Sequence, residues 1–202
     1  MFVLVENDLI TKTLNSNKGI TIGENQYPQS IYNLWSPAER EAIGVYEVVY
    51  DDTNKKHSEY YSNTDQSFNF AGGVVTASYG SATPRELNDT NQKDNNGVEL
   101  DPVVVVPGLK TKKKETIKQQ ANDLLLPSDW HVIKATEVES YSVSAEITTY
   151  RAGVRTASND MEALIDASST VDELAALYQY VNTGTVENPV MERPLGEFPE
   201  AV

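Results

Sequence analysis

The chain has 202 residues, of which 39% are hydrophobic, and carries a formal net charge of −14 at pH 7. This acidity argues against general nucleic-acid binding and against an anionic membrane surface, because both need clustered lysine and arginine. The sequence contains no cysteine, which excludes a disulfide framework, a thiolate metal site and a cysteine nucleophile. Residues 1–10 lack a charged stretch followed by an apolar run, and the valine run 103–106 is too short to cross a bilayer. We therefore expect no export signal and no membrane role.

The first 80 residues predict a small antiparallel β-meander with one short helix. Apolar or aromatic stretches separated by short turn clusters predict strands at 2–5, 9–14, 45–50, 56–62, 67–71 and 74–79. The helix is predicted to start at Ser36, because Ser36 can cap, Pro37 suits the first helical position and Glu39 can close a capping box. Gly44 is well placed to end it.

The remainder predicts a linker, a helical domain and an extended tail. Residues 81–109 are polar and rich in turn residues, so they are expected to form a linker in which 103–106 could add as an edge strand. Three or four helices are predicted over 110–181, with starts near Lys110, Ser128, Ser144 and Thr170. Residues 182–202 contain several glycines and prolines and predict an extended tail without a folded element. The predicted fold class is therefore α+β, with domains at 1–80 and 110–181.

No pattern in the sequence predicts catalytic chemistry. His57 and His131 are the only histidines, and no carboxylate stands at a metal-ligand spacing from either. Gly72 and Gly73 lie between two predicted strands, which favours a turn over a phosphate-binding loop. We expect no catalytic residue, no cofactor and no metal, and we therefore expect that the chain is not an enzyme.

The candidate interface residues are Trp35, Trp130, Tyr150, Arg151 and Arg155. Each tryptophan stands next to a predicted helix start, where a large aromatic packs into a core or forms an interface hot spot. We favour the core for both. Arg151 and Arg155 are four residues apart on one predicted helix, so they could clamp carboxylates of this chain or of a partner.

The run Lys110–Lys114 holds four lysines at a predicted helix start. Two interpretations stay open for it. It contacts an acidic partner, or it is a solvated face that nearby acidic residues balance.

Two segments of the helical half carry a resemblance to a known family. Residues 124–134 read Leu-Leu-Leu-Pro-Ser-Asp-Trp-His-Val-Ile-Lys, and residues 149–155 read Thr-Tyr-Arg-Ala-Gly-Val-Arg. This pattern resembles the C-terminal region of bacteriophage tail assembly chaperones and tail-fibre-assembly-like proteins. The stretches 1–7, 35–36, 43–46 and 188–194 are similar to marine-phage relatives. The chain departs from the family by lacking a proline before the third helix and a second tryptophan near Tyr150.

The resemblance implies a non-enzymatic role in tail or tail-fibre assembly, exerted through protein–protein contact. The implied partners are phage tail or tail-fibre proteins, with a second copy of the chain as a further possible partner and with no nucleic acid or membrane. The implied location is the host cytoplasm during assembly, and the virion tail if the protein persists there. The alternative is a permanent virion subunit such as a fibre adaptor or baseplate component. An enzyme that degrades glycans is the third and least favoured reading.

Overall fold

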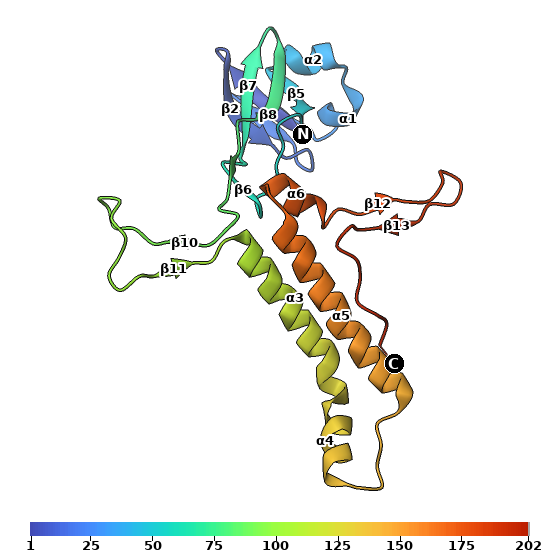
Figure 1. Cartoon of the computed structure of the whole chain (residues 1–202). Coiled ribbons are helices and arrows are strands. Elements are labelled where there is room, and N and C mark those ends of the chain that lie inside the picture. The colour runs from blue at the N-terminus through green and yellow to red at the C-terminus, as the bar shows by residue number, and fades with distance from the viewer. Residues whose placement is uncertain (202) are drawn as a thin grey trace. The chain divides into compact units, whose positions relative to one another are not determined.

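The computed structural model describes residues 1–201, and the chain divides into two compact units, Met1–Thr83 and Pro84–Val202. The first unit is rich in β-strands and the second is mainly helical (Figure 1). The α+β fold class predicted from the sequence is confirmed. Within residues 1–201, no helix combines the length and the apolar character needed to cross a membrane.

A five-stranded sheet forms the centre of the first unit. Its strand order is β2-β1-β5-β8-β7. The strands are β1 (Phe2–Glu6), β2 (Leu9–Leu14), β5 (Val45–Asp51), β7 (Gln66–Ala71) and β8 (Val74–Tyr79). All neighbours are antiparallel except β5 and β8, which run parallel. The predicted antiparallel meander therefore differs from the structure at one pairing. The second strand of the β7–β8 hairpin, β8, lies next to β5 and runs parallel to it.

The two hairpins of the sheet have the turns that their residues favour. Asn7 and Asp8 connect β1 to β2 with φ angles of 53° and 62°, and Gly72 and Gly73 connect β7 to β8 with φ angles of 58° and 77°. Two consecutive residues with positive φ make the turn whose twist matches that of antiparallel strands. Gly72 and Gly73 are thus turn residues, as the sequence indicated.

The rest of the first unit lies outside this sheet. It comprises the hairpin β3–β4 (Ile20–Ile22, Asn25–Tyr27), the helices α1 (Ile31–Leu34) and α2 (Pro37–Glu41), and the short strand β6 (Tyr61–Ser62). The two-residue strand β9 (Thr83–Pro84) holds the last residue of this unit and the first residue of the next. The capping box of α2 forms as predicted, but α1 precedes it, so two short helices replace the single one expected. The strand predicted over 56–62 is wrong apart from its last two residues.

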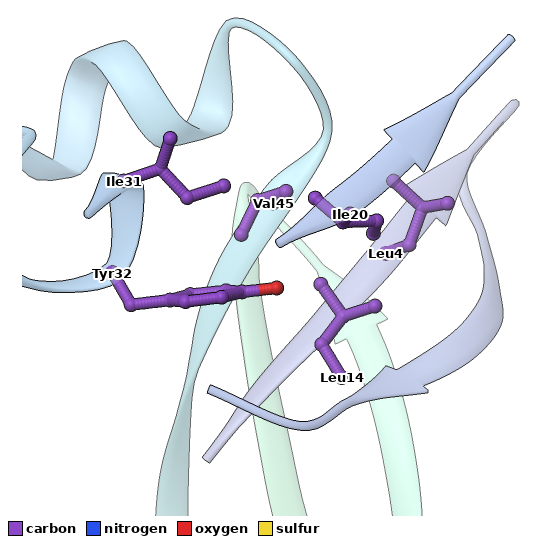
Figure 2. Close-up of a cluster of buried hydrophobic side chains, with 6 residues drawn as sticks. All are labelled: Leu4, Leu14, Ile20, Ile31, Tyr32 and Val45. Atoms are coloured by element: carbon purple, nitrogen blue, oxygen red, sulfur yellow. The ribbon is translucent and has the colours of Figure 1, made fainter. Parts of the chain in front are cut away.

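Alternation along β1 sends apolar side chains to both faces of the sheet. Leu4 joins one buried cluster, with Leu14, Ile20, Ile31, Tyr32 and Val45 (Figure 2). Val3 and Val5 join the other, with Val48, Val75 and Ala77. Successive strand residues point to opposite faces, so an unbroken apolar strand such as β1 is covered on both sides.

A long helical hairpin forms the centre of the second unit. Helix α3 (Leu109–Leu125) and helix α5 (Ala145–Ala167) lie side by side (Figure 1). The 3-10 turn η1 (Leu126–Ser128) and helix α4 (Asp129–Glu137) follow α3, and α6 (Val171–Ala176) follows α5. Ser144 and Thr170 cap α5 and α6 as predicted. Helix α6 is shorter than predicted, and the Leu177 carbonyl after it accepts from the Leu195 N–H at 3.0 Å.

Two short hairpins belong to segments predicted as linker and tail. Strands β10 (Thr90–Asn91) and β11 (Val105–Val106) pair with each other, so the valine run joins a hairpin instead of a sheet edge. Strands β12 (Val181–Asn182) and β13 (Met191–Glu192) also pair. The prediction that 182–202 contains no folded element is wrong, because Leu195 is 2% exposed and Phe198 packs against buried residues of α3 and α5.

Candidate protein-contact site

Helix α4 leaves its apolar side chains in solvent. None of its nine residues is buried. Trp130 is 51% exposed and Ile133 is 57% exposed. A helix in a folded domain ordinarily buries one apolar stripe. We name the exposed side chains of Leu126, Trp130, Val132, Ile133 and Val138 the α4 patch. Exposed apolar side chains gathered on one short helix are typical of sites of interaction with other proteins.

A buried arginine holds the start of α4. The Arg151 guanidinium donates from Nη1 to the Leu125 carbonyl at 2.9 Å and to Ser128 Oγ at 2.6 Å. Its Nη2 lies 2.7 Å from Asp129 Oδ1. The guanidinium group is planar, so its donors reach three neighbouring acceptors with little loss of conformational freedom. One side chain of α5 thus fixes the turn between α3 and α4.

Tyr150 contributes to the same junction. Its hydroxyl donates to the Leu124 carbonyl at 3.3 Å, while the Ser128 hydroxyl donates to the Leu125 carbonyl at 2.8 Å. The last carbonyls of a helix lack partners within the helix and need donors from elsewhere. Tyr150, Arg151 and Ser128 supply these donors at the end of α3. We call these three residues and Asp129 the α4 clamp.

Aromatic contacts order the surface of α4 on its exposed side. The rings of Trp130 and His131 have centroids 3.6 Å apart, and Tyr141 lies 6.3 Å from Trp130. His131 Nδ1 and the Tyr141 hydroxyl are hydrogen-bonded. The Lys134 ammonium lies 4.4 Å from the Tyr141 centroid and 5.7 Å from that of Trp130. Ring stacking and cation–π attraction restrict the side chain of Trp130 and of the residues around it.

The structure brings together some of the predicted interface residues and separates others. Tyr150 and Arg151 are buried in the clamp, and Arg151 binds a carboxylate of its own chain. Arg155 is exposed and donates to the Arg151 carbonyl at 3.3 Å, so its guanidinium group does not join the clamp. The core assignment of Trp130 is wrong, because α4 has no second layer opposite its apolar side.

Trp35 belongs to the first unit and packs as the sequence indicated. It is half-buried against the cluster drawn in Figure 2. Its ring meets Tyr27 edge-on, with centroids 5.9 Å apart. Arg40, itself buried, donates to the Trp35 carbonyl at 2.6 Å. Trp35 is therefore a packing residue.

The lysine run at the start of α3 is largely engaged within the chain. Lys114 lies 2.8 Å from Asp166, and Lys110 donates to the Asp166 carbonyl at 2.9 Å. The hydrogen bond to Asp166 raises the pKa of Lys114 above its ordinary value. Lys113 lies over the Tyr178 ring at 4.2 Å. This arrangement favours the interpretation that nearby acidic residues balance the run.

In residues 1–201, no three histidine, aspartate or glutamate side chains converge as metal ligands. A cleft of about 190 Å³ next to the clamp is lined by Leu124, Pro127, His131, Ile147 and Tyr150, among others. Its lining is mostly apolar.

Sequence reasoning missed Lys134, Tyr141 and most of the α4 patch. Leu126, Trp130 and Ile133 are spaced at i, i+4 and i+7, which is the pattern of one apolar helix face. That spacing was the available signal for an apolar face, but it does not show whether the face is buried or exposed.

No protein-family model, no curated protein and no solved structure matches this chain.

Proposed function

We propose that this chain is a non-enzymatic protein of bacteriophage tail or tail-fibre assembly that binds a tail or fibre protein through the α4 patch. The observation that carries the proposal is that α4 is firmly held at its start while none of its residues is buried. Its place of action would be the host cytoplasm during assembly, or the virion tail if the protein stays there.

The residues of the family-like pattern fall into two groups, one in the α4 clamp and one exposed, and this division supports the assignment. Ser128, Asp129, Tyr150 and Arg151 come together in the α4 clamp. Trp130, the remaining prominent residue of the pattern, is 51% exposed beside them. The polar residues of the pattern position α4, while its tryptophan is exposed to solvent. This division suits a binding surface, because tryptophan is enriched in interface hot spots.

The charge of the chain is compatible with selective binding. A net charge of −14 disfavours nonspecific association among acidic copies of the chain. Next to the α4 patch, the Lys134 ammonium lies near the rings of Trp130 and Tyr141. A partner that presents apolar side chains with a carboxylate nearby would match this surface.

Affinity capture from infected cells tests the proposal. A tagged chain should retain tail or fibre proteins, and Trp130→Ala and Ile133→Asp should each abolish that retention because they remove the apolar centre of the patch. Val186→Asp is the matched control, since Val186 is 96% exposed in the β12–β13 hairpin. Retention that survives both patch variants would contradict the assignment of the site.

Mass spectrometry of purified virions separates the assembly factor from the permanent subunit. Absence from virions, together with capture from lysate, is the expected result for an assembly chaperone. Stoichiometric presence would instead identify a fibre adaptor or baseplate component. Failure of both measurements to find a tail protein would overturn the proposal as a whole.

A further inference from the structure

The valine run Val103–Val106 is exposed on both of its faces. Its four side chains are between 42% and 58% exposed. No residue from 89 to 107 is buried, so within residues 1–201 neither face of the β10–β11 hairpin is covered. We name residues 89–107, which contain this hairpin, the valine arm.

Strand β1 shows what such an apolar run ordinarily requires. It also holds an unbroken apolar stretch, Phe2–Val5, and buried clusters cover both of its faces. It has a neighbouring strand on each edge, β2 and β5. Apolar and polar residues alternate where one face of a strand meets water, so a run without alternation is typical of a strand covered on both faces. The valine run has this pattern, but β11 has only β10 beside it.

The open edge of β11 presents backbone groups as well as side chains. The Val104 carbonyl accepts a hydrogen bond from the Gln92 N–H at 2.8 Å, on the side of β10. Val105 is the next residue and lies opposite Asn91. Successive residues of a strand direct their N–H and C=O groups to opposite edges, so those of Val105 face away from β10. Backbone groups at such an edge are a template for a further strand.

Two prolines limit the length of this edge. Pro102 and Pro107 stand immediately before and after the valine run. Proline has no N–H to donate and is confined to the ends and edges of sheets. A further strand would therefore pair along residues 103–106 and no further.

We propose that the open edge of β11 is a docking site for an edge β-strand of another protein, which joins the hairpin as a third strand. An isolated two-stranded hairpin is marginally stable in water, whereas three strands with an apolar face form a stable sheet. Strand addition gives hydrogen bonds along the main chain and contacts to alternate side chains. It would also remove part of the valine surface from water.

Charge selects the kind of strand that binds. The valine arm contains four acidic residues and one basic residue, Lys93. Edge strands of natural sheets often carry lysine, which protects them from pairing with one another. An edge strand in which apolar residues alternate with lysine therefore matches β11 in both hydrogen bonding and charge. A second copy of this chain matches it poorly, because like charges on paired strands are destabilising.

Peptide binding to the full-length chain tests the proposal by NMR. The probe is a synthetic peptide in which valine and lysine alternate, and its control has glutamate in place of lysine. We expect the lysine peptide to shift the amide resonances of residues 103–106 and to slow hydrogen exchange of the Val105 N–H by about tenfold or more. The glutamate peptide should do neither. Absence of Val105 protection at about 1 mM lysine peptide would overturn the proposal, as would signals spread over the acidic surface without that protection.

Three variants separate strand pairing from general attraction. Val105→Pro removes the outward N–H, leaves the bond between Val104 and Gln92, and should abolish binding of the lysine peptide. Val186→Pro is the matched control in the β12–β13 hairpin and should bind as the unmodified chain does. Val105→Thr keeps the N–H and should bind more weakly than the unmodified chain. Equal losses in Val105→Pro and Val105→Thr would show that the backbone edge is not the binding element.

The outcome is independent of the proposed function, because the valine arm shares no residue with the α4 patch. Peptide binding to β11 and capture of a tail protein through α4 can therefore succeed or fail separately. The resonances of residues 103–106 should not depend on protein concentration when peptide is absent. If they do, a second copy of the chain occupies the edge, and the assignment to a strand of another protein is overturned.

Discussion

Two tryptophans mark two helix starts, and they have opposite environments. Trp35 precedes α2 and packs edge-on against Tyr27 beside a buried cluster. Trp130 lies in the first turn of α4 and is 51% exposed. Each helix start is also held by a buried arginine: Arg40 donates to the Trp35 carbonyl, and Arg151 donates to Ser128 Oγ. Both helix starts are therefore stabilised in a similar way, while the surroundings of the two indole rings differ.

The difference teaches that a helix start and the burial of its tryptophan have separate causes. Capping groups and a nearby guanidinium fix where the backbone enters a helix. Burial requires a second layer of apolar side chains. Such a layer covers Trp35 but is absent beside α4 in the part of the chain that the structure describes. The exposed ring is then available as a contact surface.

Truncating the two tryptophans should separate the two environments most clearly. We expect Trp35→Ala to lower the free energy of unfolding by about 3 kcal/mol, at the lower end for large aromatic truncations because Trp35 is only half-buried. Trp130→Ala should lower it by less than about 1 kcal/mol, because an exposed ring contributes little packing. Urea titration of both variants measures this. Equal losses would mean that Trp130 is a core residue after all.

Removing Arg151 from the α4 clamp should have the next largest effect on the free energy of unfolding. Arg151→Ala deletes donors to Leu125, Ser128 and Asp129 and should cost about 2 kcal/mol, since hydrogen bonds to a charged group contribute about 1.5–3 kcal/mol. The share from Asp129 is small because that carboxylate is 45% exposed and solvent screens it. Arg155→Ala is the matched control and should change stability by less than about 0.5 kcal/mol. Thermal unfolding and amide exchange in α4 measure both variants. An Arg155 effect as large as that of Arg151 would contradict the clamp.

The features that the sequence predicted well are those that neighbouring residues determine. The capping groups Ser36, Ser144 and Thr170 each begin a helix as expected. The turn at Gly72 and Gly73 joins two strands, because adjacent positive φ angles suit glycine. The switch from strand to helix patterns also gave the α+β class. Each of these signals lies within a few residues of the structure it specifies.

The features that the sequence did not predict depend on distant residues. The parallel pairing of β5 with β8 joins strands more than twenty residues apart. The packing of Phe198 requires a cluster to which α3 and α5 both contribute. For the candidate site, Tyr150 and Arg151 were recognised, but their acceptors at Leu124 and Leu125 were not. Backbone carbonyls carry no sequence signature, so a clamp that acts on them is visible only in the folded chain.

The start of α3 provides a third case that sharpens the comparison of helix starts. Its N-cap is Gly108, which has no side chain to cap with, and Asp89 Oδ1 accepts from the Gly108 N–H at 2.8 Å instead. This bond, with one from the Thr111 hydroxyl, lowers the pKa of the Asp89 carboxyl. A carboxylate near a helix N-terminus is favourable because unpaired N–H groups there carry partial positive charge.

The direction of this pKa shift sets the pH range in which the cap acts. Because the pKa is lower in the folded chain, the stabilisation is present above the ordinary aspartate pKa of about 3.9 and is lost as pH falls through the folded value. Asp89→Asn keeps an acceptor without the charge, and Asp89→Ala removes both. At pH 7 we expect the melting temperature to fall in the order unmodified, Asn, Ala. Toward pH 2 the difference in melting temperature between the unmodified chain and Asp89→Asn should disappear. The difference between the unmodified chain and Asp89→Ala should shrink less, because a protonated aspartate can still accept the hydrogen bond. An Asn variant that matches the unmodified chain at pH 7 would show that the hydrogen bond alone starts α3.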